Sequence, residues 1–585
     1  MNFHQEIIEE LKKKDYSVKE WAKLKRDLSL KYKLKKIPTN IEILLNANDQ
    51  EMNLLKTKLS TKPVRTISGV APVAIMTKPS KCPHGKCIYC IGGINSPWGD
   101  VPQSYTGHEP ATMRGRRNNY DSYLQVFNRL QQYVLLGQNF EKVEIIIMGG
   151  TVTAEPKEYQ EEFVLGLFQA MNDFSELFFN KNEQNKDEFD YLKFKEFFEL
   201  PAENLGDKVR ESKIHRKILE QRKKSTLEVE QEKNETSKVK CVALCIETKP
   251  DWGLLEHGNE MLRLGCTRVE LGIQSVYDDV LTFVNRGHDS KTSKKSIQIL
   301  RDLGFKINFH YMPGLPLTDR KRDLKGMKKL FTDDSYKPDM IKIYPCMVGE
   351  GTPLYELYKQ GKFKPITTDE ASSLILEWKK FVPEYCRIQR VQRDVPTKMW
   401  EGGVDRTNLR QHIFDHNKVV CRCIRCREPK GKEVNWDKVE IKVDRFAASG
   451  GIEFFISVNA KAISFTAQNS KNSVAVEDTE NDLLIGFCRL RFPKEFLREE
   501  IVKGSALIRE LHVYGIATGL SEDGTSEKSP HVQHQGFGKK LMEKAEEICL
   551  QNNKKKIVVI SGVGVKGYYH KLGYRKEGPY MVKDL

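Results

Sequence analysis

The chain has 585 residues, room for roughly three or four domains that each bury a core. Its 13 cysteines and its acidic start, MNFHQEIIEE, favour a reducing compartment and metal chemistry over disulfides or a signal peptide. No apolar run approaches the ~20 residues that cross a bilayer, so we expect a soluble, cytoplasmic protein without a membrane partner. The net charge of +16 indicates a polyanionic partner, although a surface that only improves solubility would carry the same charge.

Residues 1–64 are predicted to form a basic helical segment. Between Lys12 and Lys36, lysines and arginines greatly outnumber acidic residues and are interleaved with Trp21 and Tyr32. Clustered ammonium groups neutralise phosphates, and aromatic rings stack on bases. The segment therefore indicates nucleic acid binding, with a merely solvated helix face as the alternative.

The stretch CPHGKCIYC follows a predicted buried strand over 65–76 and contains Cys82, Cys87 and Cys90. Three local thiolates can hold a 4Fe–4S cluster and leave one iron open for chemistry. The amino and carboxylate groups of S-adenosylmethionine suit that open iron, and this cofactor then carries radical chemistry. The spacing of four residues and then two departs from the commoner three and then two. A zinc site that lacks its fourth ligand and three unrelated thiols are therefore alternatives.

Strands and helices alternate from residue 65 to residue 400, which predicts parallel βα units in a partial (β/α) barrel. The predicted strands cover residues 143–148, 242–247, 268–273, 306–311 and 340–344, and a helix covers 120–136. Ligand sites in such folds gather at the carboxyl ends of the strands. We assign the residues at two of these ends to S-adenosylmethionine, namely Gly149, Gly150, Thr151 and Gln274.

Two segments are predicted to be insertions. Residues 180–240 are dense in charge and have few apolar positions beyond 191–200. We expect them to form a peripheral helical excursion with a disordered part. Residues 521–529 are expected to form a polar, mobile loop.

Residues 401–440 are predicted to form a cysteine-rich linker. Cys421, Cys423 and Cys426 can hold a structural zinc ion together with one further ligand. Zinc would stabilise a short linker that cannot bury a core of its own. The candidates for the fourth ligand are His412, His416 and Cys386. Three reduced thiols in a turn are the alternative.

Residues 441–585 are predicted to form a second module of the α+β class. Strands over 484–492 and 507–514 precede HVQHQGFG, which leads into an amphipathic helix over 537–550. A glycine turn at a helix N-terminus offers backbone amides to a pyrophosphate, although glycines also cap helices without a ligand. A strand over 556–561 and a pair of tyrosines follow this helix. This order of elements resembles the acetyl-coenzyme A fold of the GNAT acetyltransferases. Tyr568 and Tyr569 are adjacent, so at most one ring is expected to face the thioester, and core packing is the alternative role.

Several strings carry a more specific resemblance. They are RTISGVAPVAIMTKPSKCPHGKCIYC, QSYTGHEPATMR, MGGT, VELGIQS, MPGLP, RELHVYG, HQGFG and SGVGVKGYYHKLGYRKEGPYMVK. With the pairing of a radical module and an acetyl-coenzyme A module, they resemble the Elongator catalytic subunit family (elongator protein three). The resemblance covers nearly the whole chain apart from the insertions. It implies a radical SAM partial barrel followed by a GNAT-type domain, in a stand-alone form without other Elongator subunits.

The resemblance implies a tRNA wobble uridine carboxymethyltransferase. A carboxymethyl group derived from acetyl-coenzyme A would be added to the C5 carbon of the wobble uridine in the anticodon loop, where bases are readily unstacked. The implied ligands of the 4Fe–4S cluster are Cys82, Cys87 and Cys90. The implied acetyl-coenzyme A contacts are Lys142, Glu510, Leu511, His512, Val513, Phe537, Gly538, Lys539 and Tyr569, with Lys142, His512 and Tyr569 as catalytic candidates. Lys249 departs from the family pattern, because arginine is usual there and lysine lacks its bidentate geometry.

The resemblance further implies an electron donor for the cluster, and it is compatible with a homodimer. Two alternative functions stay open. A protein lysine acetyltransferase with a structural iron–sulfur cluster would use Glu510 as the base for an amine. A non-catalytic RNA-binding or scaffold protein would have decayed sites, whereas the cysteines and the glycine turn of this chain are intact.

Overall fold

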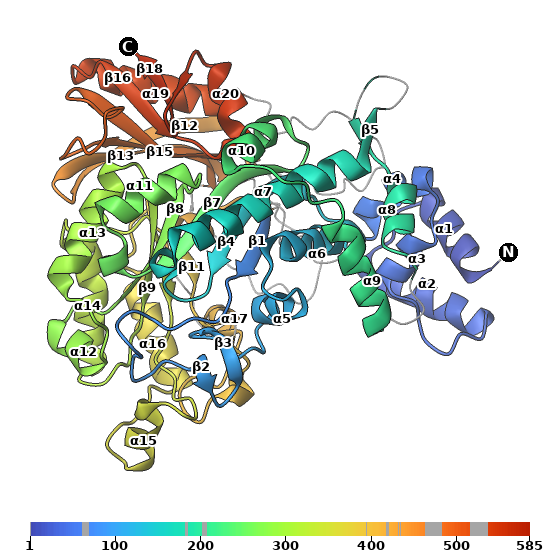
Figure 1. Cartoon of the computed structure of the whole chain (residues 1–585), viewed down its shortest axis with the longest axis horizontal. Coiled ribbons are helices and arrows are strands. Elements are labelled where there is room, and N and C mark those ends of the chain that lie inside the picture. Colours follow the sequence, from blue (N-terminus) through green and yellow to red (C-terminus); the bar gives the residue numbers. More distant parts are fainter. Residues whose placement is uncertain are drawn as a thin grey trace. The chain divides into compact units, whose positions relative to one another are not determined.

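The computed structural model divides into two compact units (Figure 1). Unit 1 comprises Met1–Val73, Asp121–Glu144 and Glu161–Val242, and unit 2 comprises Ala74–Tyr120, Ile145–Gln160 and Ala243–Leu585. The structure describes residues 2–60, 69–181, 185, 187–201, 207–393, 395–416, 421–430, 432, 434–462, 483–514 and 536–585. The predicted loop over 521–529 and the first part of the glycine motif, 531–535, lie outside the described residues. Within the described residues, no helix is both long enough and apolar enough to cross a bilayer.

Unit 1 begins with short helices, as the sequence predicts. They are α1 (Phe3–Lys13), α2 (Val18–Lys31), α3 (Asn40–Leu45) and α4 (Asp49–Lys58). Asn2, Ser17 and Thr39 cap the first three helices, and each forms a reciprocal capping box with the Gln or Glu three residues later. The helices bury apolar side chains such as Ile7 and leave basic side chains such as Lys23 exposed. The N-terminal segment is therefore a folded helical unit with a basic surface.

The insertion over 180–240 contributes to the core of unit 1. The insertion contains β6 (Asp187–Phe189), α8 (Tyr191–Phe197), α9 (Lys208–Leu219) and α10 (Leu227–Thr236), and β5 (Phe179–Lys181) lies at its start. The helices α6 (Ser122–Leu135) and α7 (Lys157–Phe178) precede it in the chain. Phe194 of the insertion is buried against Phe178 of α7, with ring centroids 5.4 Å apart. Ile214 and Leu227 are buried as well. The helices expected for this segment are present, and the segment is anchored in the core of unit 1 through α7.

A seven-stranded sheet in the order β1-β4-β7-β8-β9-β10-β11 contains the predicted barrel strands. They are β1 (Ala71–Met76), β4 (Lys142–Met148), β7 (Lys240–Thr248), β8 (Arg268–Gln274), β9 (Lys306–Tyr311), β10 (Met340–Ile343) and β11 (Arg387–Arg390). The strands from β7 to β11 pair in parallel. Between them lie α11 (Leu255–Arg263), α12 (Asp278–Phe283), α13 (Ser290–Asp302), α14 (Arg320–Thr332), α15 (Pro353–Lys359) and α16 (Thr368–Lys379). This order confirms the partial barrel of parallel βα units.

A second seven-stranded sheet, in the order β12-β13-β14-β15-β16-β18-β17, forms the C-terminal module. Its strands are β12 (Val434–Ala448), β13 (Gly451–Ala462), β14 (Leu483–Phe492), β15 (Ser505–Val513), β16 (Lys556–Ile560), β17 (Arg575–Glu577) and β18 (Tyr580–Asp584). Helix α19 (Phe537–Gln551) buries its predicted apolar face, including Leu541 and Ala545, in the core on one face of this sheet. Helix α20 (Lys566–His570) follows β16. The α+β class predicted for this module is confirmed.

Buried ion pairs join the barrel to the C-terminal sheet inside unit 2. Asp339, which precedes β10, accepts a hydrogen bond from Nη2 of Arg509 at 2.7 Å and lies 3.5 Å from Nη1 of Arg489. Burial works to raise the pKa of Asp339, but the two guanidinium groups lower it far below its usual range. We call the whole set the interdomain charge cluster, and its members are Asp302, Asp339, Glu453, Arg489, Arg491 and Arg509.

We expect Asp339→Asn to lower the free energy of unfolding by about 3–5 kcal/mol, because buried guanidinium groups then lose their shared carboxylate. Urea-induced unfolding followed by circular dichroism measures this loss. Arg320→Gln is the control, because it breaks an exposed pair with Glu377 (2.9 Å) that contributes at most about 1 kcal/mol. Equal losses in the two variants would contradict the structural importance of the interdomain charge cluster.

Candidate functional site

The cysteine loop, residues 77–91, lies between β1 and the hairpin of β2 (Gly92–Ser96) and β3 (Gly99–Gln103). Cys87 and Cys90 are buried, Cys82 is partly exposed, and all three are free thiols. Burial, with Cys90 nearby, raises the pKa of Cys82 to about 11, so a bound metal is needed to deprotonate this group at neutral pH. The polar neighbours of the sulfurs are Thr151 Oγ1 for Cys82 (3.8 Å), His84 Nε2 for Cys87 (3.2 Å) and Ser104 Oγ for Cys90 (3.1 Å).

The surroundings of the three sulfurs fit a cluster better than a single ion. Gln103 donates an amide N–H to the sulfur of Cys90 (3.2 Å), and Arg286 donates a guanidinium N–H to that of Cys87 (3.7 Å). Hydrogen bonds of this kind tune iron–sulfur thiolates. Among the described residues, the groups of metal-ligating atoms within 4.8 Å of one another do not include Cys82, Cys87 and Cys90. These three sulfurs are therefore not arranged as the ligands of a single metal ion.

The glycine turn after β4 lies against the cysteine loop, as its assignment to the same site requires. Gly149 and Gly150 have φ values of 145° and 100°, which favour glycine. A Cβ atom on Gly150 would lie 3.9 Å from the sulfur of Cys82. Gln274 ends β8, and its buried Oε1 has no hydrogen-bond partner among the described residues. A ligand that donates a hydrogen bond would satisfy this oxygen, which supports the prediction that Gln274 contacts S-adenosylmethionine.

The C-terminal sheet opens where the acetyl-coenzyme A residues were predicted. β15 pairs with β16 from Ser505 to Ile508, whereas it pairs with β14 as far as Val513. The two parallel strands therefore separate after Ile508. Backbone groups that lose their strand partner on one side can bind an extended, amide-containing ligand. The predicted contacts from Glu510 to Val513 all lie in this separated part of β15.

Glu510 connects the two modules. Its carboxylate pairs with Lys306 of β9 and accepts a hydrogen bond from Nε of Arg489 at 2.8 Å. Burial alone would raise the pKa of Glu510, but these two cations outweigh it and lower the pKa to about 2. Glu510 is therefore a weak base at neutral pH, and its carboxylate is already paired.

His512 lies two residues further along β15, beside the ring of Tyr514 at a centroid distance of 4.4 Å. Burial lowers the pKa of His512 to about 4, against the opposing effect of Glu510. Its Nε2 is buried and has no hydrogen-bond partner among the described residues. His512 is therefore a neutral imidazole with one ring nitrogen free for a ligand.

The start of α19 contains the predicted pyrophosphate turn. Gly536 caps the helix with φ 73°, and a Cβ atom on Gly538 would lie 2.6 Å from the hydroxyl of Tyr568. Tyr569 is buried in the core with its ring 6.0 Å from that of Tyr574, whereas Tyr568 is exposed. The two tyrosines thus face different surroundings, as expected. The structure brings Tyr568 to the turn, and the catalytic role of Tyr569 stays a prediction.

Two predicted coenzyme ligands are exposed lysines. Lys539 lies in the first turn of α19, where an ammonium group can approach a bound pyrophosphate. Lys142 begins β4 in unit 1. The contact of Lys142 with the coenzyme and its catalytic role stay predictions.

A polar cluster inside the barrel was missed by the sequence analysis. Lys342 of β10 pairs with Glu270 and lies 3.7 Å from Glu247, and Nε2 of His310 lies 2.7 Å from Glu270. These strands are otherwise apolar, so isolated charges such as Glu270 in VELGI were the available signal. The carboxylates and His310 come close enough to hold a metal ion. Lys342 and the buried Arg268, which lies 3.3 Å from Glu270, already supply positive charge to the two carboxylates.

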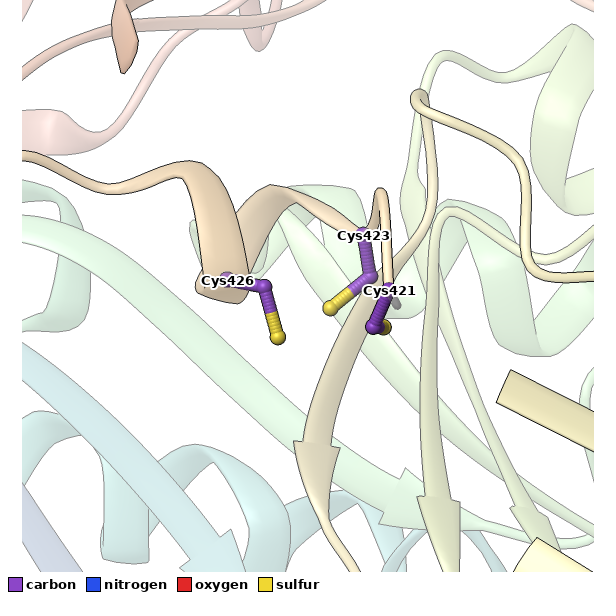
Figure 2. Close-up of side chains that lie close together, drawn as sticks. All are labelled: Cys421, Cys423 and Cys426. Atoms are coloured by element: carbon purple, nitrogen blue, oxygen red, sulfur yellow. The ribbon is translucent and has the colours of Figure 1, made fainter. Parts of the chain in front are cut away.

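The linker cysteines form a compact group. Cys421, Cys423 and Cys426 have sulfurs within 4.8 Å of one another (Figure 2). Cys421 precedes α18 (Ile424–Arg427), Cys423 is its N-cap residue and Cys426 lies within it. The carbonyl of Cys386 accepts a hydrogen bond from the N–H of Ile424. Within the described part of the chain, this group has no fourth metal-ligating atom in the same range. The three cysteines can therefore supply three thiolate ligands of a zinc site, and the fourth ligand stays a prediction.

Comparisons with known proteins agree with this arrangement. Residues 1–67 match the ELP3 N-terminal domain, 209–325 the Radical SAM superfamily, 338–417 the Radical_SAM C-terminal domain and 529–584 the acetyltransferase (GNAT) domain. The chain is 42% identical to a tRNA uridine(34) acetyltransferase of Methanocaldococcus infernus, over 94% of this chain and 92% of that one. It is 37% identical to the Elongator complex protein 3 of Bos taurus, over 96% of this chain and 93% of the relative. The chain belongs to the Elongator complex protein 3 family.

A solved structure of this family extends the agreement to the fold. The N-terminally truncated archaeal Elp3 of Methanocaldococcus infernus superimposes with a TM-score of 0.68 at 36% identity. The match covers 89% of this chain and 100% of the other. The radical SAM half-barrel followed by a GNAT domain, expected from the sequence, is thereby confirmed.

We expect Gly538→Trp to abolish acetyl-coenzyme A binding, because the new side chain would lie against Tyr568 and fill the turn. Isothermal titration calorimetry with the coenzyme measures the loss. Gly567→Trp is the matched control, since a Cβ atom there meets open space. Normal binding by Gly538→Trp would show that the pyrophosphate binds elsewhere.

Proposed function

We propose that this protein modifies the wobble uridine of tRNA by adding a carboxymethyl group derived from acetyl-coenzyme A to its C5 carbon. The observation that carries the proposal is the presence of both chemistries in one compact unit. The cysteine loop, the glycine turn and the separated strands β15 and β16 all belong to unit 2, and the interdomain charge cluster joins their modules. The family relatives named tRNA uridine(34) acetyltransferase support the same substrate.

In this proposal Cys82, Cys87 and Cys90 hold a 4Fe–4S cluster, and Gln274 and the turn at Gly150 bind S-adenosylmethionine. When bound, these cofactors supply one-electron chemistry that activates the methyl group of the acetyl thioester. The protein residues orient the groups around that reaction. Burial of Cys87 and Cys90 keeps water and oxidants from the thiolates.

The C-terminal module binds acetyl-coenzyme A in this proposal. The backbone from Glu510 to Val513 holds the pantetheine arm, and the amides at Gly538 and Lys539 bind the pyrophosphate. His512 is neutral at physiological pH because burial lowers its pKa to about 4, so its buried Nε2 can form a hydrogen bond with the bound coenzyme.

The structure favours this function over a protein lysine acetyltransferase. Such an enzyme needs a carboxylate or imidazole that takes a proton from an amine. Glu510, the candidate from the sequence, is paired with Lys306 and Arg489, and its pKa is lowered to about 2 by these cations against the effect of burial. A group this acidic and already neutralised cannot serve as that base at neutral pH.

Unit 1 is proposed to bind the tRNA. Its N-terminal helices leave Lys19, Lys23 and Arg26 exposed, and such groups neutralise phosphates. The archaeal relatives are named tRNA uridine(34) acetyltransferase, a name that mentions no complex, and we propose that this chain also works without other Elongator subunits. An external electron donor would reduce the cluster, and a homodimer is a further part of the proposal.

The test uses acetyl-coenzyme A labelled in its methyl carbon, with tRNA, S-adenosylmethionine and a reductant under anaerobic conditions. We expect label in tRNA with the wild-type protein and none with Cys87→Ala, because the cluster loses a ligand. Cys266→Ala is the control, since this buried cysteine precedes β8 and lies outside the core cluster that contains Cys87 and Cys90. Label in protein lysines without S-adenosylmethionine would contradict the proposal and favour the acetyltransferase.

We also propose that Cys421, Cys423 and Cys426 hold a structural zinc ion. Cys423→Ala should release the zinc, as measured by elemental analysis, and should lower the melting temperature, because metal binding stabilises a short linker. Iron content should stay at the wild-type level, since the cluster ligands are separate. Wild-type protein that contains no zinc after expression in zinc-supplemented medium would contradict this site.

A further inference from the structure

The segment between α12 and α13, residues 284–289, holds the cysteine loop in place. The carbonyl of Val284 accepts a hydrogen bond from the N–H of Ile88 (3.2 Å), and Asn285 donates to the carbonyl of Lys86 (2.9 Å). Gly287, with φ 76°, packs so closely that a Cβ atom there would lie 2.5 Å from Cβ of His84. We call residues 284–289 the cradle segment. Nothing in the sequence analysis assigned a role to it.

Arg286 of the cradle segment points its guanidinium group at the cluster loop. Its Nη1 donates to the sulfur of Cys87 at 3.7 Å, and its Nη2 donates to the carbonyl of Gly272 on β8 at 2.8 Å. The residue is 8% exposed. Within the described residues, Arg286 forms no ion pair with a carboxylate, whereas the buried Arg268, Lys342, Arg491 and Arg509 each do so.

A buried guanidinium group without a carboxylate partner is costly unless another negative charge compensates it. The group that the structure places beside Arg286 is the sulfur of Cys87, which is a thiolate when it binds iron. His84 approaches the same sulfur with Nε2 at 3.2 Å. Arg286 is therefore a buried guanidinium group in contact with a proposed cluster ligand.

We propose that Arg286 is the counter-charge of the iron–sulfur centre and raises its reduction potential. The inference rests on the proposed function, because it requires the cluster on Cys82, Cys87 and Cys90. One-electron reduction of a cluster held by three thiolates adds one negative charge to this buried site. A fixed positive charge beside Cys87 stabilises the reduced state more than the oxidised one. Arg286 is thus a positioning residue that acts through Cys87 and does not touch the substrate.

The test is a redox titration of the anaerobically reconstituted full-length protein, followed by electron paramagnetic resonance. We expect Arg286→Gln to lower the ratio of reduced to oxidised cluster at least tenfold at a fixed potential. For a one-electron couple this corresponds to a midpoint about 59 mV more negative. Arg286→Lys keeps the charge and should stay closer to the wild type. Arg320→Gln removes an exposed arginine and should leave the midpoint unchanged.

Gly272→Ala is a second variant that moves the guanidinium group without changing the charge. A Cβ atom on Gly272 would overlap Nη2 of Arg286, so the side chain must shift from Cys87. Its midpoint should move in the same direction as that of Arg286→Gln. If Arg286→Gln fails to bind iron, full iron binding by Arg286→Lys supports the proposal, and failure of both variants overturns it in favour of a structural role.

The outcomes separate this inference from the function on which it rests. Wild-type midpoints in Arg286→Gln and Gly272→Ala, both with full iron content, would overturn the role of Arg286 and leave the cluster in place. Wild-type protein that binds no reducible cluster would overturn the proposed function itself.

Discussion

The arrangement of unit 2 depends on the pairing of buried charges between its barrel and its C-terminal sheet. Arginines on β14 and β15 pair with carboxylates that belong to the barrel. Asp339 accepts a hydrogen bond from Arg509 and lies 3.5 Å from Nη1 of Arg489. A buried ion loses much of its hydration, so each member requires its partner in place. This requirement fixes the orientation of the GNAT sheet against the parallel strands more strictly than apolar contacts would, because ion pairs demand both distance and direction.

Glu510 shows how this constraint shapes function. It lies in the part of β15 that separates from β16, where the coenzyme arm is proposed to bind, and its side chain pairs with Lys306 of the barrel. Glu510, the candidate base of an acetyltransferase, therefore links the two modules through its ion pairs. In the proposed function, the same strand offers its backbone to the coenzyme while Glu510 pairs with Lys306 of the barrel.

Around the cysteine loop, residues remote in sequence complete the site. Gln103, Thr151 and Arg286 each place a polar atom beside one of the sulfurs, and they come from a hairpin, a glycine turn and the cradle segment. Only Thr151 was assigned to this site from the sequence. Gln103 begins the string QSYTGHEPATMR, but neither Gln103 nor Arg286 was assigned to the sulfurs, because a hydrogen bond to sulfur requires no motif of its own.

The sequence by itself determined the order of modules, the parallel strands of the barrel and the amphipathic helix α19, because hydrophobic periodicity and cysteine spacing are local properties of the chain. It did not show that the segment over 180–240 is anchored to α7, where Phe178 packs on Phe194. The tertiary structure decided which charges are paired. Folding places Lys342 beside Glu270. Among the described residues, it places the sulfur of Cys87, and no carboxylate, in contact with Arg286. Burial and long-range contact set the energy of a charge, and neither can be read from neighbouring residues.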